Sequence, residues 1–323
     1  MRIIMPGLLI CILIALATTF IADHYGGPTL LYALLFGMSL HFLSEDGPCR
    51  AGIEFASKTV LRLGVALLGV RITLEQVASL GVGPVITVVL GVVATIVFGA
   101  LLARVMGLLT GGSVAICGAS AALALSAVMP RNATSERHTI MTVVGVTTLS
   151  TVAMITYPLI VRLLGLEDTE AGIFLGGTIH DVAQVVGAGY IISEHTGDVS
   201  TFVKLLRVAM LVPAVMVFML LFRSARQANG DEGGKVPMFP TFLIAFVALV
   251  LINSLGWVPS VAVEGFTDLS RWCLVAAIAA LGVKTSFQKL AVVGWKPVIL
   301  MVVETLFLLV LVTLCIKFGL ASV

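Results

Sequence analysis

The chain has 323 residues, of which 59% are hydrophobic and only 11% are charged, and its mean hydropathy is +1.14. Soluble domains carry about 25% charged residues. The composition therefore excludes an ordinary soluble protein and predicts an all-α polytopic membrane protein. The formal net charge of +2 and the scatter of the basic residues give no reason to expect a nucleic-acid partner.

Long apolar runs separated by clusters of charge divide the chain. A helix needs about 20 residues to cross roughly 30 Å of hydrocarbon, and about eleven runs reach or approach that length. No polar stretch is long enough for a soluble domain, so residues 1–323 are expected to form a single transmembrane domain. The predicted segments lie near residues 3–22, 28–43, 56–78, 84–106, 111–129, 138–164, 171–192, 201–223, 239–257, 268–287 and 297–318.

The loops indicate orientation and class. With the N-terminus inside, more Lys and Arg residues fall on the cytoplasmic side than on the other. We therefore expect a multi-pass protein of the cell inner membrane with a cytoplasmic N-terminus. The sequence has no P-loop, no H-E-x-x-H and no metal-ligand cluster. We expect no cofactor, no metal and no enzymatic activity.

An internal repeat accompanies these segments. Residues 66–86 align without gaps on residues 279–299, with matching Leu-Gly-Val and Pro-Val-Ile triplets. This predicts repeat units of about 28–106 and 239–318 around a broken-helix core of about 107–223. The copies start an odd number of segments apart, so their topology should be inverted, as is typical of secondary carriers.

The first candidate site is a glycine-rich interruption at residues 111–120. Irregular backbone is tolerated in a membrane only where protein or a water-filled cavity surrounds it, and a helix that starts there offers free N–H groups to an anion. Packing of small residues between helices is the structural alternative. The predicted substrate-binding residues of this interruption are Ser113, Cys117, Gly118, Ala119 and Ser120.

The second candidate site is the interruption at residues 176–187. Gly177, Thr178 and Gln184 are the predicted substrate-binding residues there. Ionisable side chains inside a span usually mark a pathway or a proton relay. We predict that His180 and Asp181 couple transport to protons, since histidine changes charge near neutral pH. The alternative is a structural His–Asp hydrogen bond at the membrane edge.

Two arginines could neutralise an anion. Arg62 lies inside the third predicted segment and Arg207 at the start of the eighth. A helix end stabilises an anion by about 0.3–2 kcal/mol, less than the several kcal/mol that desolvation of a charge costs. A guanidinium with its fork geometry could supply the difference, although either arginine could instead snorkel to an interface.

These residues support a resemblance. The similar stretches lie at residues 61–64, 69–73, 113–119, 178–186, 204–208 and 280–282. In them the chain resembles the bacterial YeiH-like membrane proteins, a family associated with sulfate export. Members carry Glu where this chain has Asp181, which preserves a carboxylate. The family is distantly similar to the bile-acid symporters and cation/proton antiporters, which implies two discontinuous helices crossing near the membrane centre and a scaffold that forms a homodimer.

Together these features predict a secondary active transporter, in the exporting direction, for a small anion. Sulfate, sulfite and an organosulfonate are the leading substrates, and H⁺ is preferred to Na⁺ as the coupling ion. One alternative is a cation/proton antiporter in which Asp181 binds the cation. Another is a membrane sensor that binds a ligand without transporting it.

Overall fold

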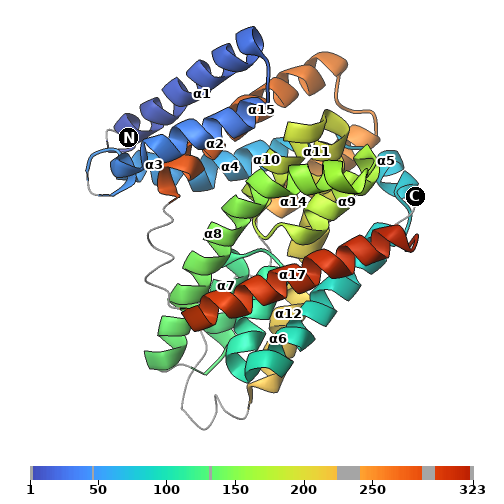
Figure 1. The fold of residues 1–323 in the computed structure, drawn as a ribbon. Coiled ribbons are helices and arrows are strands. Elements are labelled where there is room, and N and C mark those ends of the chain that lie inside the picture. The colour runs from blue at the N-terminus through green and yellow to red at the C-terminus, as the bar shows by residue number, and fades with distance from the viewer. Residues whose placement is uncertain (1–2, 46, 131–132, 224–240, 286–294, 321–323) are drawn as a thin grey trace. The chain divides into compact units, whose positions relative to one another are not determined.

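The computed structural model describes residues 3–45, 47–130, 133–223, 241–285 and 295–320 (Figure 1). Within these ranges every regular element is helical, which confirms the predicted all-α class. Among the described residues, six helices are long and apolar enough to cross a membrane, and four shorter apolar helices accompany them. The count of eleven segments and the inverted repeat stay predictions, and residues 286–294 of the second repeat copy lie outside the described ranges. The six long helices cover Met5–Tyr25, Gly83–Ala115, Arg137–Leu164, Glu194–Leu221, Ser260–Lys284 and Trp295–Lys317.

The chain divides into two compact units. The first unit contains residues 1–81, 186–198 and 240–286, and the second contains residues 82–185, 199–239 and 287–323. Helices α10 (Val182–Ile192) and α11 (Glu194–Ala209) contribute residues to both units. This division into two units does not test the predicted single transmembrane domain, its two repeat units or its broken-helix core.

In the first unit, α15 (Ser260–Lys284) packs against α1 (Met5–Tyr25), α2 (Thr29–Ser39) and α4 (Leu61–Leu68). The contact between α2 and α15 depends on two glycines. A Cβ atom on Gly37 would lie 2.9 Å from the backbone nitrogen of Val283, and Gly37 and Gly282 face each other. Small residues let membrane helices approach this closely. The unit also contains η1 (His41–Ser44), α3 (Arg50–Phe55), η2 (Ala56–Val60), α5 (Leu74–Ser79) and α14 (Thr241–Ser254).

The segment predicted at residues 56–78 is not one continuous helix. It begins with the π-helical turn η2, continues as α4 to Leu68 and restarts as α5 at Leu74. Thr73 explains the restart, because its hydroxyl accepts the Gln76 N–H at 3.3 Å while the Gln76 side chain accepts the Thr73 N–H at 3.0 Å. This reciprocal capping box starts a new helix.

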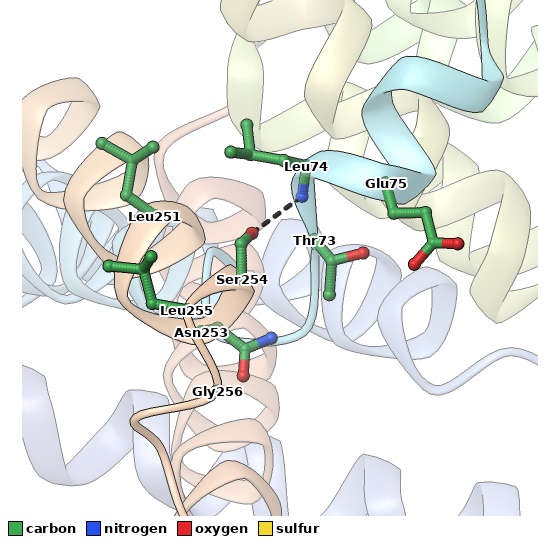
Figure 2. A pocket seen from close by; sticks show the side chains of 8 residues that line it. All are labelled: Thr73, Leu74, Glu75, Leu251, Asn253, Ser254, Leu255 and Gly256. Atoms are coloured by element: carbon green, nitrogen blue, oxygen red, sulfur yellow. Dashed lines mark hydrogen bonds between the residues drawn. The ribbon is translucent and has the colours of Figure 1, made fainter.

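A pocket of about 450 Å³ lies where α5 meets α14 (Figure 2). Two of its polar side chains, those of Thr73 and Ser254, already have structural partners. Ser254 accepts the Leu74 N–H at 2.8 Å, and Thr73 caps α5. None of the predicted site residues lines this pocket, so we interpret it as a joint between two helices of the first unit.

In the second unit, α6 (Gly83–Ala115) is a helical hairpin. Ala103 and Arg104 leave helical geometry, and Arg104 has φ +46°. The two arms, residues 83–102 and 105–115, run back along each other, with Gly99 against Gly107 and Gly111 against the carbonyl group of Thr95. The chain therefore turns before residue 106, earlier than the predicted gap between residues 106 and 111.

Helix α17 (Trp295–Lys317) lies along α6 and also contacts α8 (Ala133–Leu164) and α9 (Asp168–Thr178). Glycines again provide the close contacts, since Gly145 of α8 faces Met301 and Gly177 of α9 faces Val312. The unit is completed by α7 (Ala119–Val128), most of α11 and α12 (Leu211–Leu221). These helices position the two predicted interruptions.

Candidate transport site

The first interruption contains a helix break. Helix α6 ends at Ala115 and α7 begins at Ala119. Gly118 allows the break because its φ of +62° is one that glycine adopts without strain, and its N–H donates to the Ser113 carbonyl at 2.8 Å. Ser113, Cys117 and Ser120, which have the i, i+4, i+7 spacing of one helix face, do not share a face here, since the helix ends between them. Ser113 and Cys117 are buried, whereas Ser120 is exposed.

The second interruption also contains a break. Helix α9 ends at Thr178 and α10 begins at Val182, so His180 and Asp181 lie in the break itself. Two side chains of neighbouring helices fix it. The Asp181 N–H donates to the Ser150 hydroxyl of α8 at 3.0 Å, and His180 Nε2 lies 3.0 Å from the Thr305 hydroxyl of α17.

The hydrogen-bond network assigns the tautomer of His180. The Thr305 hydroxyl has one hydrogen, which it donates to the Met301 carbonyl at 2.7 Å. His180 Nε2 must then carry the hydrogen of the shared bond, and Nδ1 of the neutral ring is an acceptor. His180 is fully buried, and Nδ1 has no hydrogen-bond partner among the described residues. A proton could therefore bind there.

Two cations of α11 join the breaks. Lys204 Nζ donates to the carbonyls of Ile116, at 2.8 Å, and Ile179, at 2.9 Å. Arg207 donates to four carbonyls, those of Val114, Ala115, Gly176 and Ile179, at distances of 2.7 to 3.0 Å. These groups lie at the C-terminal ends of α6 and α9, where carbonyls lack helical donors and the dipole is negative.

The sequence pattern predicted a role for Arg207 but none for Lys204. A signal for Lys204 was present, because residues at i and i+3 share a helix face, and Lys204 precedes Arg207 by that spacing in an apolar segment. Both side chains are almost fully buried. A guanidinium has five N–H donors and an ammonium three, so one donor of each stays unused among the described residues.

Asp181 occupies the place that the sequence suggested for an external anion. Its carboxylate accepts the Ala119 N–H at the start of α7 and lies against Gly118, where a Cβ atom would come within 2.6 Å of Oδ1. Lys204 acts on this carboxylate as a neighbouring positive charge. The N-terminal end of α7 therefore already has a negative group from the protein.

The other predicted residues divide into two groups. Gln184, at the start of α10, is fully buried, and neither polar atom of its amide has a partner among the described residues. The hydroxyls of Ser113 and Thr178 bond back to the carbonyls of Leu109 and Phe174, both at 2.6 Å.

Three remaining predicted residues have other surroundings. Gly177 packs against α17, and Ala119 is half-buried at the start of α7. Arg62 is exposed on α4 in the first unit, so the structure does not place it with the breaks. Within the described ranges, His, Cys, Asp and Glu nowhere form a group of three that could hold a metal ion.

Comparison with known proteins gives the family. Residues 6–301 match the family described as conserved hypothetical protein 698. A UPF0324 membrane protein of Chlorobaculum tepidum is 57% identical over 95% of this chain and 87% of its own length. The UPF0324 membrane protein TauZ of Paracoccus pantotrophus is 51% identical over 95% of this chain and 93% of its own length. No solved structure matches the chain.

These matches include the stretches on which the resemblance to the YeiH-like proteins was based. A relative from Rhizobium meliloti, also named as a UPF0324 membrane protein, is 50% identical over 95% of this chain and 91% of its own length. The chain therefore belongs to the UPF0324 family of membrane proteins.

Proposed function

We propose that the protein is a secondary active transporter that exports a small oxyanion across the cell inner membrane. The observation that carries this proposal is the pair of buried cations, Lys204 and Arg207, held at the junction of two broken helices. Broken helices in a membrane protein characteristically form the substrate sites of secondary carriers. The proposed membrane topology keeps the N-terminus in the cytoplasm.

The lengths of the half-helices support a site near the membrane centre. The second arm of α6, α7, α9 and α10 each have 10 or 11 residues. At 1.5 Å per residue each spans about 16 Å, which is about half of a 30 Å hydrocarbon core. If each pair of halves makes one crossing, the breaks lie at mid-depth and the segments add up to the predicted eleven.

The charges around the breaks favour an anion. Two helix C-termini and two N-termini meet there, and their partial charges of about 0.5 each cancel. Lys204 and Arg207 then contribute two positive charges and Asp181 one negative charge, which leaves one net positive charge when His180 is neutral. A cation/proton antiporter would need the opposite sign.

The same count suggests a role for protons. A doubly charged oxyanion would change the net charge from +1 to −1, and a proton on His180 Nδ1 would restore neutrality. A singly charged sulfonate would need no proton. We therefore propose that His180 takes up a proton together with a divalent anion and that Asp181 supports the charge balance. The preference of H⁺ over Na⁺ follows from this arrangement.

The names of two relatives support a sulfur oxyanion as the proposed substrate. Both carry the name TauZ, which relates them to taurine, an organosulfonate. We propose that the Gln184 amide and the unused donors of Lys204 and Arg207 bind the anion, with residues 113–120 and 177–178 shaping the site. We propose separately that Arg62 helps to neutralise the anion and that the protein forms a homodimer in the lipid bilayer.

The test is counterflow of radiolabelled sulfate into proteoliposomes that contain the full chain and unlabelled sulfate. Uptake above that of empty liposomes is expected, and it should be faster at pH 6 than at pH 8 because the proposed carrier takes up a proton together with each divalent anion. Sulfite, taurine and isethionate, added outside as competitors, would rank the substrates. If neither sulfate nor any of these anions, each radiolabelled in turn, shows counterflow, the proposal is contradicted and a sensor is favoured.

Asp181→Asn separates the anion carrier from a cation antiporter. The amide oxygen still accepts the Ala119 N–H, but the negative charge is gone. An anion carrier keeps sulfate counterflow with a changed KM, since the net charge of its site rises. A cation antiporter loses its cation ligand and hence all activity. Glu264→Asn, at an exposed position of α15, is the control for the loss of a carboxylate elsewhere.

A further inference from the structure

A second buried acid lies away from the two breaks. Glu304 of α17 is fully buried in the second unit, against the hairpin formed by the two arms of α6. A Cβ atom on Gly99, in the first arm, would come within 2.5 Å of Glu304 Oε1, and one on Gly111, in the second arm, within 3.5 Å. The carboxyl group thus occupies space that both glycines leave open, and the proposed anion site does not use it.

The hydrogen bonds of Glu304 fit a neutral acid. Thr110 Oγ1 lies 2.8 Å from Glu304 Oε1 and 3.1 Å from the Met106 carbonyl, but its hydroxyl has one hydrogen for two acceptors. A protonated Glu304 resolves this conflict, because the acid donates to Thr110 Oγ1 and Thr110 donates to Met106. Both contacts are then hydrogen bonds.

An ionised Glu304 would be poorly compensated. A carboxylate has about four acceptor sites, and here it would have a single donor, since Oε2 has no hydrogen-bond partner among the described residues. Burial of a charge is costly unless it is paired, and Glu304 forms no ion pair with another described residue. The neutral acid is therefore the form that this environment accommodates.

The charges of the surrounding helices lie at their ends or belong to other contacts. Helix α17 packs against α6, α8 and α9. His180 follows α9, and its contact on α17 is Thr305, not Glu304. The other described charged or titratable residues of these four helices are Arg104, Arg137, His138, Tyr157, Arg162, Asp168, Glu170, Lys296, Cys315 and Lys317. None of them is hydrogen-bonded to Glu304 or paired with it.

We propose that Glu304, together with Thr110, is a proton-binding site that holds a proton in the resting carrier and exchanges it during the transport cycle. The proposal names a coupling site and rests on the proposed transport function. It differs in role from His180, which responds to the anion in its own site. Glu304 would instead link the proton gradient to movement of α17 along the α6 hairpin.

The presence of the proton can be tested without any substrate. Infrared difference spectra of wild type and Glu304→Gln, both as full chains in lipid, should show the C=O stretching band of a protonated carboxylic acid in the wild type alone. The band should shift when D₂O replaces water, because the acid proton exchanges. A difference spectrum with only carboxylate bands, or a band that never shifts in D₂O, would overturn the proposal.

The coupling role needs a transport assay. The measured quantity is the ratio of sulfate uptake driven by a pH gradient to sulfate counterflow at equal pH. Glu304→Gln should lower this ratio at least tenfold, and Glu264→Gln, at an exposed position, should leave it at the wild-type value. An unchanged ratio in Glu304→Gln would overturn the coupling role. Uptake driven by a Na⁺ gradient at constant pH, lost in that variant, would replace the proton with sodium.

The two tests have distinguishable outcomes, and a second variant covers a failure of Glu304→Gln to fold. If wild type shows no counterflow, the proposed function fails for sulfate, while the infrared test still decides whether Glu304 carries an exchangeable proton. Glutamine has the shape of the neutral acid, so Glu304→Gln should fold. If it does not, Glu304→Asp serves instead, and its acid band should be shifted relative to that of the wild type. An unshifted band would assign the acid to another residue.

Discussion

The two helix breaks differ in what they contribute. The first, at residues 116–118, offers backbone carbonyls and a glycine in the left-handed region, and its only polar side chain is that of Cys117. The second, at residues 179–181, adds His180 and Asp181, whose contacts reach α17, α8 and the start of α7. The first break thus contributes mainly backbone groups and the second contributes side chains. Helix α11 is hydrogen-bonded to both.

Removal of Arg207, which joins the two breaks, should have the largest effect on stability. Arg207→Ala is expected to cost at least about 3 kcal/mol of unfolding free energy, because four buried carbonyls lose a donor and an unsatisfied buried group costs about 1–3 kcal/mol. Thermal unfolding in detergent measures it. Arg223→Ala, at an exposed position, is the matched control and should change stability by no more than about 0.5 kcal/mol.

Arg207→Lys sharpens this experiment. It retains the charge but loses the fork that serves both helix ends, so its stability should lie between those of wild type and Arg207→Ala. Equal stability of Arg207→Ala and Arg223→Ala would show that the carbonyl contacts contribute nothing.

A medium effect is expected at the first break. Gly118 and Gly165 both have φ +62°, so an alanine at either position costs about 1–2 kcal/mol of backbone strain. Only at Gly118 would the new Cβ atom also displace Asp181, since nothing lies within 4 Å of the corresponding position at Gly165. Gly118→Ala should therefore be less stable than Gly165→Ala by at least about 1 kcal/mol. Equal unfolding midpoints of the two variants would show that the contact with Asp181 adds nothing to the cost of the substitution.

The smallest effects should separate the side chains of the two breaks. Cys117→Ala is expected to keep both sulfate counterflow and its dependence on pH, because the thiol makes no hydrogen bond that the proposal needs. His180→Ala should equalise counterflow at pH 6 and pH 8, since the proposed proton acceptor, Nδ1, is lost. His24→Ala, on α1 of the first unit, is the control for histidine loss. A pH response that persists in His180→Ala would exclude His180 as the responding group.

The sequence predicted where the helices break but not what the breaks contact. Glycines and polar residues inside apolar runs are local signals, and both breaks lie within the predicted interruptions. Asp181 at the start of α7 and Lys204 on the carbonyl of Ile116 are contacts between residues far apart in the chain. Spacing along one helix does not encode them.

The α6 hairpin shows a second kind of limit. Its turn places Arg104, not a glycine, at positive φ, and no proline marks the position. Because such a conformation is uncommon for residues other than glycine, the sequence favoured a turn nearer to the glycines at 111 and 112. Here the tertiary contact of Gly99 with Gly107 decides the geometry.

The six hydrogen bonds from α11 have a mechanical consequence. They join both broken helices to one helix, α11, so the two breaks cannot move apart without the loss of these hydrogen bonds. If the protein is the carrier that we propose, it must therefore move both broken helices and the bound anion together as one rigid body. In the carrier that we propose, the surrounding helices, and not the two breaks, would then open and close access to the bound anion.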